Sequence, residues 1–223
     1  MNFRHEWKHE INAEDILLLR QRLQAVMKMD EHAVQGRYEV RSLYFDNAAD
    51  KVLMEKINGM KYREKFRIRY YNCNTNRIML EKKTKCNGLG TKRSAALTKE
   101  EVQAVIDGQW DWMMESEQEL IREWYTKIIT QGLRAKTIVA YTREPFVYGP
   151  GNVRVTLDYN IRTGLDCTDF LNFGSITVPT REQTAVLEVK WDAFLPDIIK
   201  DAVQLKGRRT SAFSKYQVCR AYG

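Results

Sequence analysis

Long apolar runs are missing from this 223-residue sequence. No stretch approaches the roughly 20 apolar residues that a membrane-spanning helix needs. The first six residues, Met1 to Glu6, also lack the apolar core of a signal peptide. We therefore expect a soluble, cytoplasmic chain, for which a peripheral position at the inner face of the membrane, through a partner, is one possibility.

Cysteine and histidine are scarce, with four and three residues, and no CxxC pair occurs. This spacing disfavours a disulfide framework or a zinc site and favours buried or incidental thiols. A GxxxxGK[ST] run is also missing, which excludes a P-loop nucleotide site. The residues concerned are Cys73, Cys86, Cys167, Cys219, His5, His9 and His32.

Charge, in contrast, is plentiful and unbalanced. Thirty-six lysines and arginines face 29 acidic residues, for a formal net charge of +7. This excess favours an anionic partner, such as nucleic acid, an acidic membrane surface or a phosphate polymer. The length and a hydrophobic fraction of 43% are consistent with one packed domain over residues 1–223.

Capping residues and glycines predict the helices. Asn12 is the expected cap of a helix over 13–29, and Thr98 with Glu101 forms a capping box for a helix ending near Asp107. Ser116 with Glu119 predicts another, ending near Gly132. Two further helices are expected from Pro196 to Lys206 and from Ser211 to Arg220.

Alternating and β-rich segments predict the strands. We expect strands at 41–46, 52–57, 134–144, 152–161 and 185–191. Residues 62–71 and 77–85 read as a hairpin, and 87–90 as a turn. Several hairpin-linked strands with capping helices favour one antiparallel α+β domain.

Five short runs place charged side chains at every second position, with Thr156 as the one uncharged member. They are Arg4-Glu6-Lys8, Arg63-Lys65-Arg67-Arg69, Glu81-Lys83-Lys85, Arg154-Thr156-Asp158 and Glu188-Lys190. Residues two apart share one face of a strand, so each run forms a charged row. A half-exposed sheet facing water shows the same alternation. Converging rows would instead make a cationic cavity suited to polyphosphate and a divalent ion. Periodicity leaves both readings open.

The order of short motifs along the chain resembles a known family, the polyphosphate-polymerase domain of the vacuolar transporter chaperone (VTC) complex in its bacterial form. That domain is one of the triphosphate tunnel metalloenzymes. The matching stretches are 4–11, 44–47, 67–70, 80–84, 91–93, 141–143, 154–158, 187–190 and 214–216. Two departures stand out: Ser94 replaces a basic residue frequent in bacterial relatives, and Glu6-Trp7-Lys8 keeps only part of the ExExK signature of the adenylate-cyclase branch.

The resemblance implies an antiparallel β-barrel tunnel of about eight strands with a polar interior and surrounding helices. It places phosphate-gripping, catalytic cations at Lys8, Arg67, Arg69, Lys83, Arg143, Arg154 and Lys190. It adds phosphate contacts at Lys92, Arg93, Ser214 and Lys215. Glu188 becomes the main ligand for Mn²⁺ or Mg²⁺, with Glu6, Glu81 and Asp158 completing or tuning that site.

The function that the resemblance implies is transfer of the ATP γ-phosphate to a growing inorganic polyphosphate, with the product passed to a separate membrane protein. An inorganic triphosphatase in the same tunnel and a non-catalytic polyphosphate-binding module stay as alternatives. Nucleic-acid binding is disfavoured because Tyr62, Phe66 and Tyr70 fall opposite the basic row. No single face of the strand would then combine aromatic residues for base stacking with basic residues for phosphate contacts.

Overall fold

Strands of alternating polarity build one curled antiparallel sheet in the computed structural model, which describes residues 4–180 and 184–221. Eight strands in this described part follow one another in the order β1-β10-β8-β7-β3-β4-β5-β6. They are β1 (His5–Ile11), β3 (Tyr38–Asp46), β4 (Tyr62–Tyr71), β5 (Asn74–Cys86), β6 (Leu89–Leu97), β7 (Arg134–Tyr148), β8 (Val153–Thr163) and β10 (Ala185–Trp191). Two short strands, β2 (Lys28–Met29) and β9 (Val178–Pro179), pair with β7 and β8.

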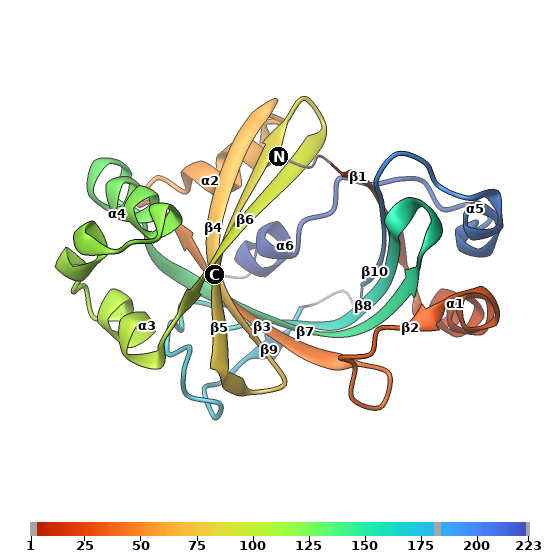
Figure 1. The fold of residues 1–223 in the computed structure, drawn as a ribbon, viewed down its shortest axis with the longest axis horizontal. Helices are drawn as coiled ribbons and strands as arrows, with labels where there is room; N and C mark the ends of the chain where they lie inside the picture. Colours follow the sequence, from red (N-terminus) through yellow and green to blue (C-terminus); the bar gives the residue numbers. More distant parts are fainter. Residues whose placement is uncertain (1–3, 181–183, 222–223) are drawn as a thin grey trace.

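The sheet curls until its two ends approach each other. A single antiparallel bridge joins Arg4, just before β1, to Gly90 in β6. The result is a half-barrel with helices around it (Figure 1). This confirms the predicted α+β fold, an antiparallel tunnel of about eight strands.

Apolar residues of the strands form two cores on the outer side of the sheet, where helices cover them. Helices α3 (Lys99–Ile106) and α4 (Glu119–Gln131) lie beside β4 to β6, with the 3₁₀ turn Asp111–Glu115 between them. Phe66, Ile68 and Trp124 are buried in this core. On the other side, α1 (Ala13–Val26) and α5 (Asp197–Val203) cover a second core that contains Leu157 and Leu187. The charged rows are thereby left on the concave face.

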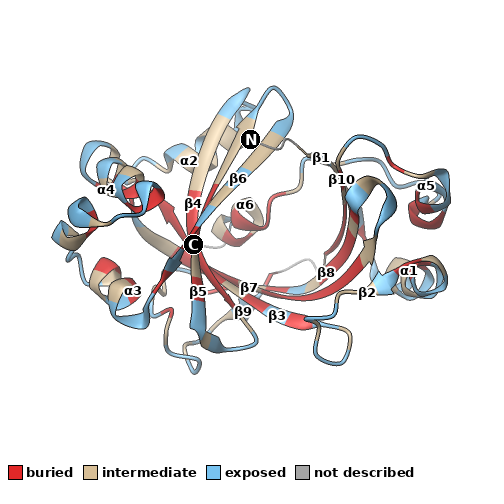
Figure 2. Cartoon of the chain, viewed as in Figure 1, coloured by how far each residue is buried: buried red, intermediate tan, exposed pale blue. Residues whose placement is uncertain are grey.

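The last helix, α6 (Lys215–Arg220), lies inside the curl (Figure 1). Its Tyr216 and Cys219 join a third buried cluster with Val139 and Tyr141 of β7. The Tyr216 hydroxyl donates to Asp46 Oδ2 at 2.8 Å, which attaches α6 to the end of β3. Helix α6 therefore fills part of the concave side, and Figure 2 shows its buried face.

Several predicted elements need correction. Residues 52–57 form helix α2 (Lys51–Ile57) and not a strand. The first helix ends at Val26, so Lys28 and Met29 belong to β2. The Ser116–Glu119 capping box does not form, because Gln118 precedes α4 without a side-chain cap.

Other boundaries shift without a change of element. The expected turn at 87–90 is confined to Asn87 and Gly88, both with positive φ, which is the two-residue hairpin that an Asn-Gly pair favours. Strand β6 then begins at Leu89. Helices α5 and α6 are shorter than expected, although Ser214 caps α6 by accepting from the Gln217 amide. None of the helices in the described part of the chain is long and apolar enough to cross a membrane.

Candidate functional site

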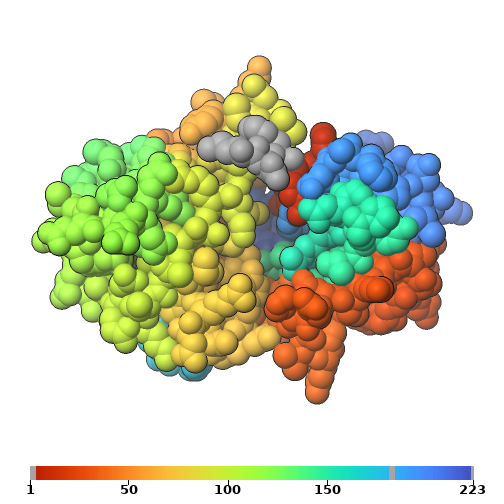
Figure 3. Space-filling view, in the orientation of Figure 1, coloured from red at the N-terminus to blue at the C-terminus, as the bar shows by residue number. Residues whose placement is uncertain are grey.

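A cavity of about 540 Å³ lies between the concave face of the sheet and the segment leading into α6. Figure 3 shows the hollow in the middle of the molecule, with the C-terminal part of the chain, in blue, on its floor. Every side chain predicted to hold phosphate or metal lines this cavity, except Arg93 and Asp158. The charged rows therefore face inward, which answers the question that periodicity left open.

Cross-strand pairing explains why the rows converge. On β4 and β5, Lys65 lies opposite Lys83 and Arg67 opposite Glu81. On β1 and β10, Lys8 lies opposite Glu188 and Glu6 opposite Lys190. Opposite residues of an antiparallel pair share a face. Two pairs of adjacent strands therefore direct their charges into the same cavity. We call β4–β5 the first wall and β1–β10 the second wall.

Glu81 organises the cations of the first wall. Its Oε2 accepts from Arg67 Nε at 2.8 Å and Nη2 at 2.6 Å, and its Oε1 accepts from Lys92 at 3.0 Å. Arg69 Nη1 lies 3.8 Å from the same carboxylate. Burial opposes the charge on Glu81, but these three cations outweigh it and hold its pKa far below the usual range. Glu81 is thus a fixed counter-ion and a poor proton acceptor.

Glu188 has the same role in the second wall. It lies 2.8 Å from Lys190, 3.2 Å from Lys215, 3.4 Å from Lys8 and 3.6 Å from Arg143. Burial raises its pKa less than these cations lower it, so the pKa falls well below the usual value. Glu188 is therefore ionised and available to a cation that displaces a lysine.

Asp158 lies outside the cavity lining and is fully buried. Arg143 binds it through Nε and Nη2 at 2.6 Å each, and Lys215 contacts it at 2.6 Å. These partners occupy both carboxylate oxygens. The structure thus places Asp158 as a support for Arg143 and Lys215 instead of bringing it to a metal site.

Lys65 and Lys83 lie opposite each other on β4 and β5, and neither forms an ion pair with a carboxylate within the described residues. Burial is the main cause that lowers the pKa of each ammonium, and neighbouring cations lower it further. The pKa of Lys65 falls to about 8, and that of Lys83 falls well below its usual value. Two such facing lysines form a place where an anion is strongly favoured.

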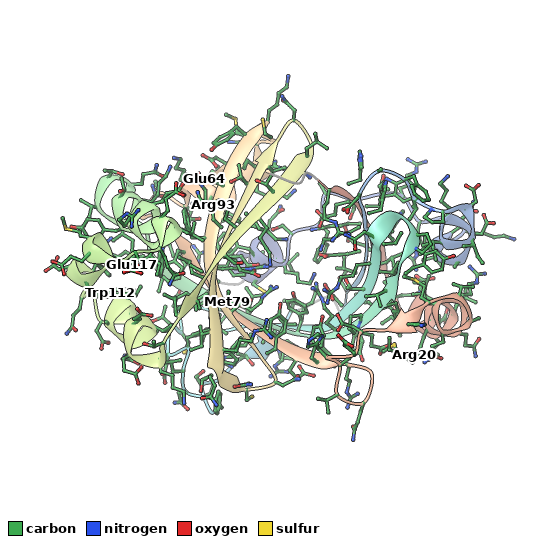
Figure 4. All side chains as sticks on the ribbon, viewed as in Figure 1. Arg20, Glu64, Met79, Arg93, Trp112 and Glu117 are labelled. Atoms are coloured by element: carbon green, nitrogen blue, oxygen red, sulfur yellow. The ribbon has the colours of Figure 1, made fainter. Side chains whose placement is uncertain are left out.

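Arg93 does not reach the cavity, contrary to the expectation. It pairs with Glu119 and Glu123 of α4 at 3.0 and 2.9 Å. Figure 4 shows Arg93 and Glu64 beside α4, on the outer face of the sheet. Lys92 and Arg93 are adjacent in β6, so their side chains point to opposite faces. This alternation was available from the sequence alone.

Arg154 and Ser214 line the cavity but are already engaged by the protein. Arg154 pairs with Asp30 at 3.0 Å and donates to the Tyr38 hydroxyl. The Ser214 hydroxyl accepts from the Gln217 amide at 3.4 Å. The Ser214 O–H and the Arg154 Nε–H are still available to an anion, because Ser214 only accepts in that bond and Arg154 Nε has no hydrogen-bond partner in the described part of the chain.

A divalent ion fits best at Glu6 and Glu188. Both carboxylates lie within 3.6 Å of the same two lysines, Lys8 and Lys190. Burial raises the pKa of Glu6, but Lys8 and Lys190 lower it by more, so the pKa falls to about 2. No group of three or more acidic, histidine or cysteine side chains with metal-site geometry occurs in residues 4–180 and 184–221. Mg²⁺ and Mn²⁺ suit one or two carboxylates supplemented by phosphate oxygens, so the donor set fits an ion that arrives with its substrate.

Several cavity residues were absent from the expected site, among them Lys65, Tyr44 and Tyr141. Lys65 belongs to the same row as Arg67 and Arg69, and Tyr141 is two residues from Arg143, so their spacing was a sufficient signal. The Tyr44 hydroxyl accepts from Arg67 at 2.7 Å, and Tyr141 accepts from Arg69 at 3.1 Å. Nothing in the sequence indicated that Tyr44 of β3 turns toward the cavity.

Comparison with known proteins identifies the family of this chain and structures that share its fold. The family model of the VTC domain matches residues 3–222. No curated protein sequence matches the chain. A crystal structure from Bacillus halodurans, described as a putative adenylate cyclase, is similar with a TM-score of 0.50 and 14% identity, over 84% of this chain and 81% of that one. A protein structure from Pyrococcus horikoshii has a TM-score of 0.51 and 13% identity, over 96% and 98%. At these identities the two structures show a shared fold only.

Proposed function

Because the chain belongs to the VTC domain family, we propose that it is an ATP-dependent polyphosphate polymerase. The observation that carries this proposal is the facing pair Lys65 and Lys83, two half-buried cations without a carboxylate partner in the described residues, inside a cavity walled by further cations. A chain of phosphates supplies the missing negative charge. Its repeating anionic groups match charged rows better than a single phosphate does.

Binding rests on residues that the protein holds in place before substrate arrives. Arg67 and Arg69 are held by Glu81, and Arg143 is held by Asp158. Fixed guanidinium groups contact phosphate oxygens without a large loss of side-chain entropy. Lys65 and Lys83 gain a counter-ion, and Lys8 and Lys190 exchange Glu188 and Glu6 for phosphate.

The transfer step needs positioning and neutralisation of charge. A terminal oxygen of the polyphosphate chain attacks the γ-phosphorus of ATP and forms a new P–O bond. The bond between that phosphorus and the β–γ bridging oxygen breaks, and ADP leaves with its electron pair. The lysines and arginines of the cavity stabilise the charge that develops on the leaving oxygen. Glu188, with Glu6, would hold Mg²⁺ or Mn²⁺, which supplies further neutralisation of phosphate charge when bound.

The carboxylates favour phosphate over water as the acceptor. The pKa values of Glu6, Glu81 and Glu188 are all lowered by their cationic neighbours, after burial has opposed the shift. Such carboxylates are weak general bases. A water nucleophile benefits from a base, whereas a terminal phosphate is already ionised. The inorganic triphosphatase is therefore the second candidate.

The test is incubation of the purified protein with ATP, Mn²⁺ and a short polyphosphate primer. We expect long polymer on a gel together with ADP. Release of free phosphate without polymer would instead identify a triphosphatase. Tight polyphosphate binding without either product would indicate a binding module and contradict the proposal.

The first variant is Glu188→Gln. We expect it to abolish metal-dependent turnover and to keep most of the affinity for polyphosphate, because the amide retains the shape but binds a divalent ion poorly. Glu117→Gln, on an exposed residue before α4, is the matched control for the loss of one negative charge. Full turnover by Glu188→Gln would show that the metal assignment is wrong.

A further inference from the structure

Exposed apolar side chains gather at three places in residues 4–180 and 184–221. Leu17 and Ile198 lie on the neighbouring helices α1 and α5. Phe173 and Ile176 lie in the segment before β9. The third place, at the mouth of the cavity, differs from the other two in its charge.

We call this third surface the rim patch and define it by Ile57, Met60, Tyr62 and Leu89. Their exposed fractions are 53%, 54%, 58% and 38%, which is unusual for side chains of this size. They come from the end of α2, the start of β4 and the start of β6. The Asn87 amide donates to the Lys61 carbonyl at 3.1 Å, and Tyr62 pairs with Cys86 across β4 and β5. These contacts hold the three chain segments together.

The strand tips that carry the rim patch project from the molecule. In Figure 1 the tips of β4 and of the β5–β6 hairpin lie together at the top of the view, and Figure 2 shows them exposed. Figure 3 shows the same orange and yellow segments standing out beside the hollow. A projecting apolar edge can insert into a deformable surface, but it does not form a groove that would bind a peptide.

Cations surround the rim patch. Lys61 is exposed, and Lys56, Arg63 and Lys85 line the adjoining mouth of the cavity. The nearby carboxylates are already paired: Glu55 pairs with Lys51 at 3.8 Å, and Glu64, which also accepts from the Tyr62 hydroxyl at 3.5 Å, pairs with Lys82 at 2.8 Å. The strand tips therefore carry apolar side chains on the outer face, where Tyr62 and Leu89 lie, and cations on the inner face, where Arg63 and Lys85 line the cavity.

The other two apolar places carry acidic side chains beside the apolar ones. Asp166 and Asp169 accompany Phe173 and Ile176 in their segment, where Arg41 of β3 contacts Asn172 and Ser175. On α5, Asp197 pairs with Lys200 at 2.7 Å beside Ile198. The rim patch, in contrast, adjoins Lys56, Lys61, Arg63 and Lys85.

We propose that the rim patch docks this protein on an anionic lipid bilayer, with the cavity mouth toward the headgroups. Ile57, Met60, Tyr62 and Leu89 enter the interface between headgroups and acyl chains. Lys61 and the cations of the mouth contact lipid phosphates. The inference stands independently of the proposed polymerase activity, since it rests on the outer surface at the rim.

The experiment is co-sedimentation of the full chain with vesicles. One set contains phosphatidylcholine alone, and the other contains phosphatidylcholine with 30% phosphatidylglycerol, a figure chosen as roughly the anionic content that gives a strong surface potential. We expect binding to the second set and little to the first, with weaker binding as salt is raised. Failure to bind the anionic vesicles at low salt would overturn the proposal, and would direct attention to a protein partner.

Matched variants separate docking from general attraction by a basic protein. Ile57→Ser with Met60→Ser should weaken binding by more than about tenfold, because two apolar side chains no longer enter the interface. Lys61→Glu should weaken it roughly tenfold. Phe173→Ser and Lys99→Glu, which change an apolar and a cationic residue elsewhere on the surface, should leave it unchanged. Equal losses in the rim variants and their controls would refute a specific docking surface.

ATP and polyphosphate binding by the rim variants provides the second readout. None of Ile57, Met60 and Lys61 lines the cavity, so binding of these anions should stay within about twofold of the unaltered protein. Loss of vesicle binding together with loss of anion binding would indicate misfolding, and circular dichroism of each variant decides that point. Loss of vesicle binding alone supports the proposal.

Discussion

Lys65 and Tyr44 lie together in the cavity, with the Lys65 ammonium 5.5 Å from the centre of the Tyr44 ring. Burial lowers the pKa of Lys65 to about 8, aided by Lys8 and Arg67. For Tyr44, burial raises the pKa, but Arg67, Lys65 and Arg69 outweigh it and lower the pKa to about 8. Both residues therefore lose a proton far below the pH at which they would in the unfolded chain.

This shared range predicts a pH dependence of anion binding. As the pH rises through about 8, both proton losses reduce the positive charge of the cavity, so affinity for tripolyphosphate should fall several-fold between pH 7 and 9.5. Lys65→Arg keeps the positive charge at high pH, so its pH dependence of affinity should be only the part due to Tyr44. The pH dependence of Tyr44→Phe should be only the part due to Lys65. Calorimetric titration at several pH values measures this. An unchanged profile in both variants would contradict the assignment.

The same shifts have a defined effect on stability. Between about pH 8 and 10 the unfolded chain binds more protons at these two residues than the folded protein does. Stability of the unligated protein should therefore rise with pH across this range. Urea unfolding at pH 7.5 and 9.5 gives the sign directly.

Among the elements, α2 and α6 depend on one residue, Asp46 at the end of β3. Its Oδ1 accepts from the Asn47 and Val52 amides at 2.9 Å, and its Oδ2 accepts from the Leu53 amide at 3.1 Å and from Tyr216 at 2.8 Å. Asp46 thus satisfies free amides at the start of α2 and fixes the helix that carries Lys215.

Removal of this carboxylate should be costly. We expect Asp46→Ala to lower the free energy of unfolding by about 3 kcal/mol, since several buried donors lose their acceptor. Tyr216→Phe removes only one of these hydrogen bonds and should lower it by about 1 kcal/mol. Urea denaturation of both variants tests the ranking. A larger loss for Tyr216→Phe would mean that packing of α6, and not Asp46, dominates.

Asp46 also explains the one element whose type was predicted wrongly. Residues 52–57 are a short apolar and polar mixture, for which strand and helix periods cannot be distinguished. The helix forms there because an acceptor outside the segment satisfies its first amides. Thr98 and Glu101, in contrast, form the cap of α3 from within the segment, and that helix was predicted correctly.

At the scale of the whole molecule, the cavity concentrates like charges that repel each other until an anion binds. Tripolyphosphate should therefore stabilise the folded state. At a concentration 100 times its dissociation constant, the gain is about 2.7 kcal/mol, or roughly 5–10 °C in Tm for a chain of this size. Differential scanning calorimetry with and without tripolyphosphate tests this. Lys83→Met, which removes a cavity cation without a carboxylate partner in the described residues, should reduce the shift.

Side chains alternate at every second residue of a strand, so the sequence was enough to place Arg63, Lys65, Arg67 and Arg69 on one face and to separate Lys92 from Arg93. Which face is concave depends on where the helices pack and how the sheet curls, and this became known from the fold alone. Tertiary contacts also decided that Glu6 shares its lysines with Glu188 while Asp158 is enclosed by Arg143 and Lys215. These neighbours come from strands far apart in the chain, and local periodicity carries no information about their distance.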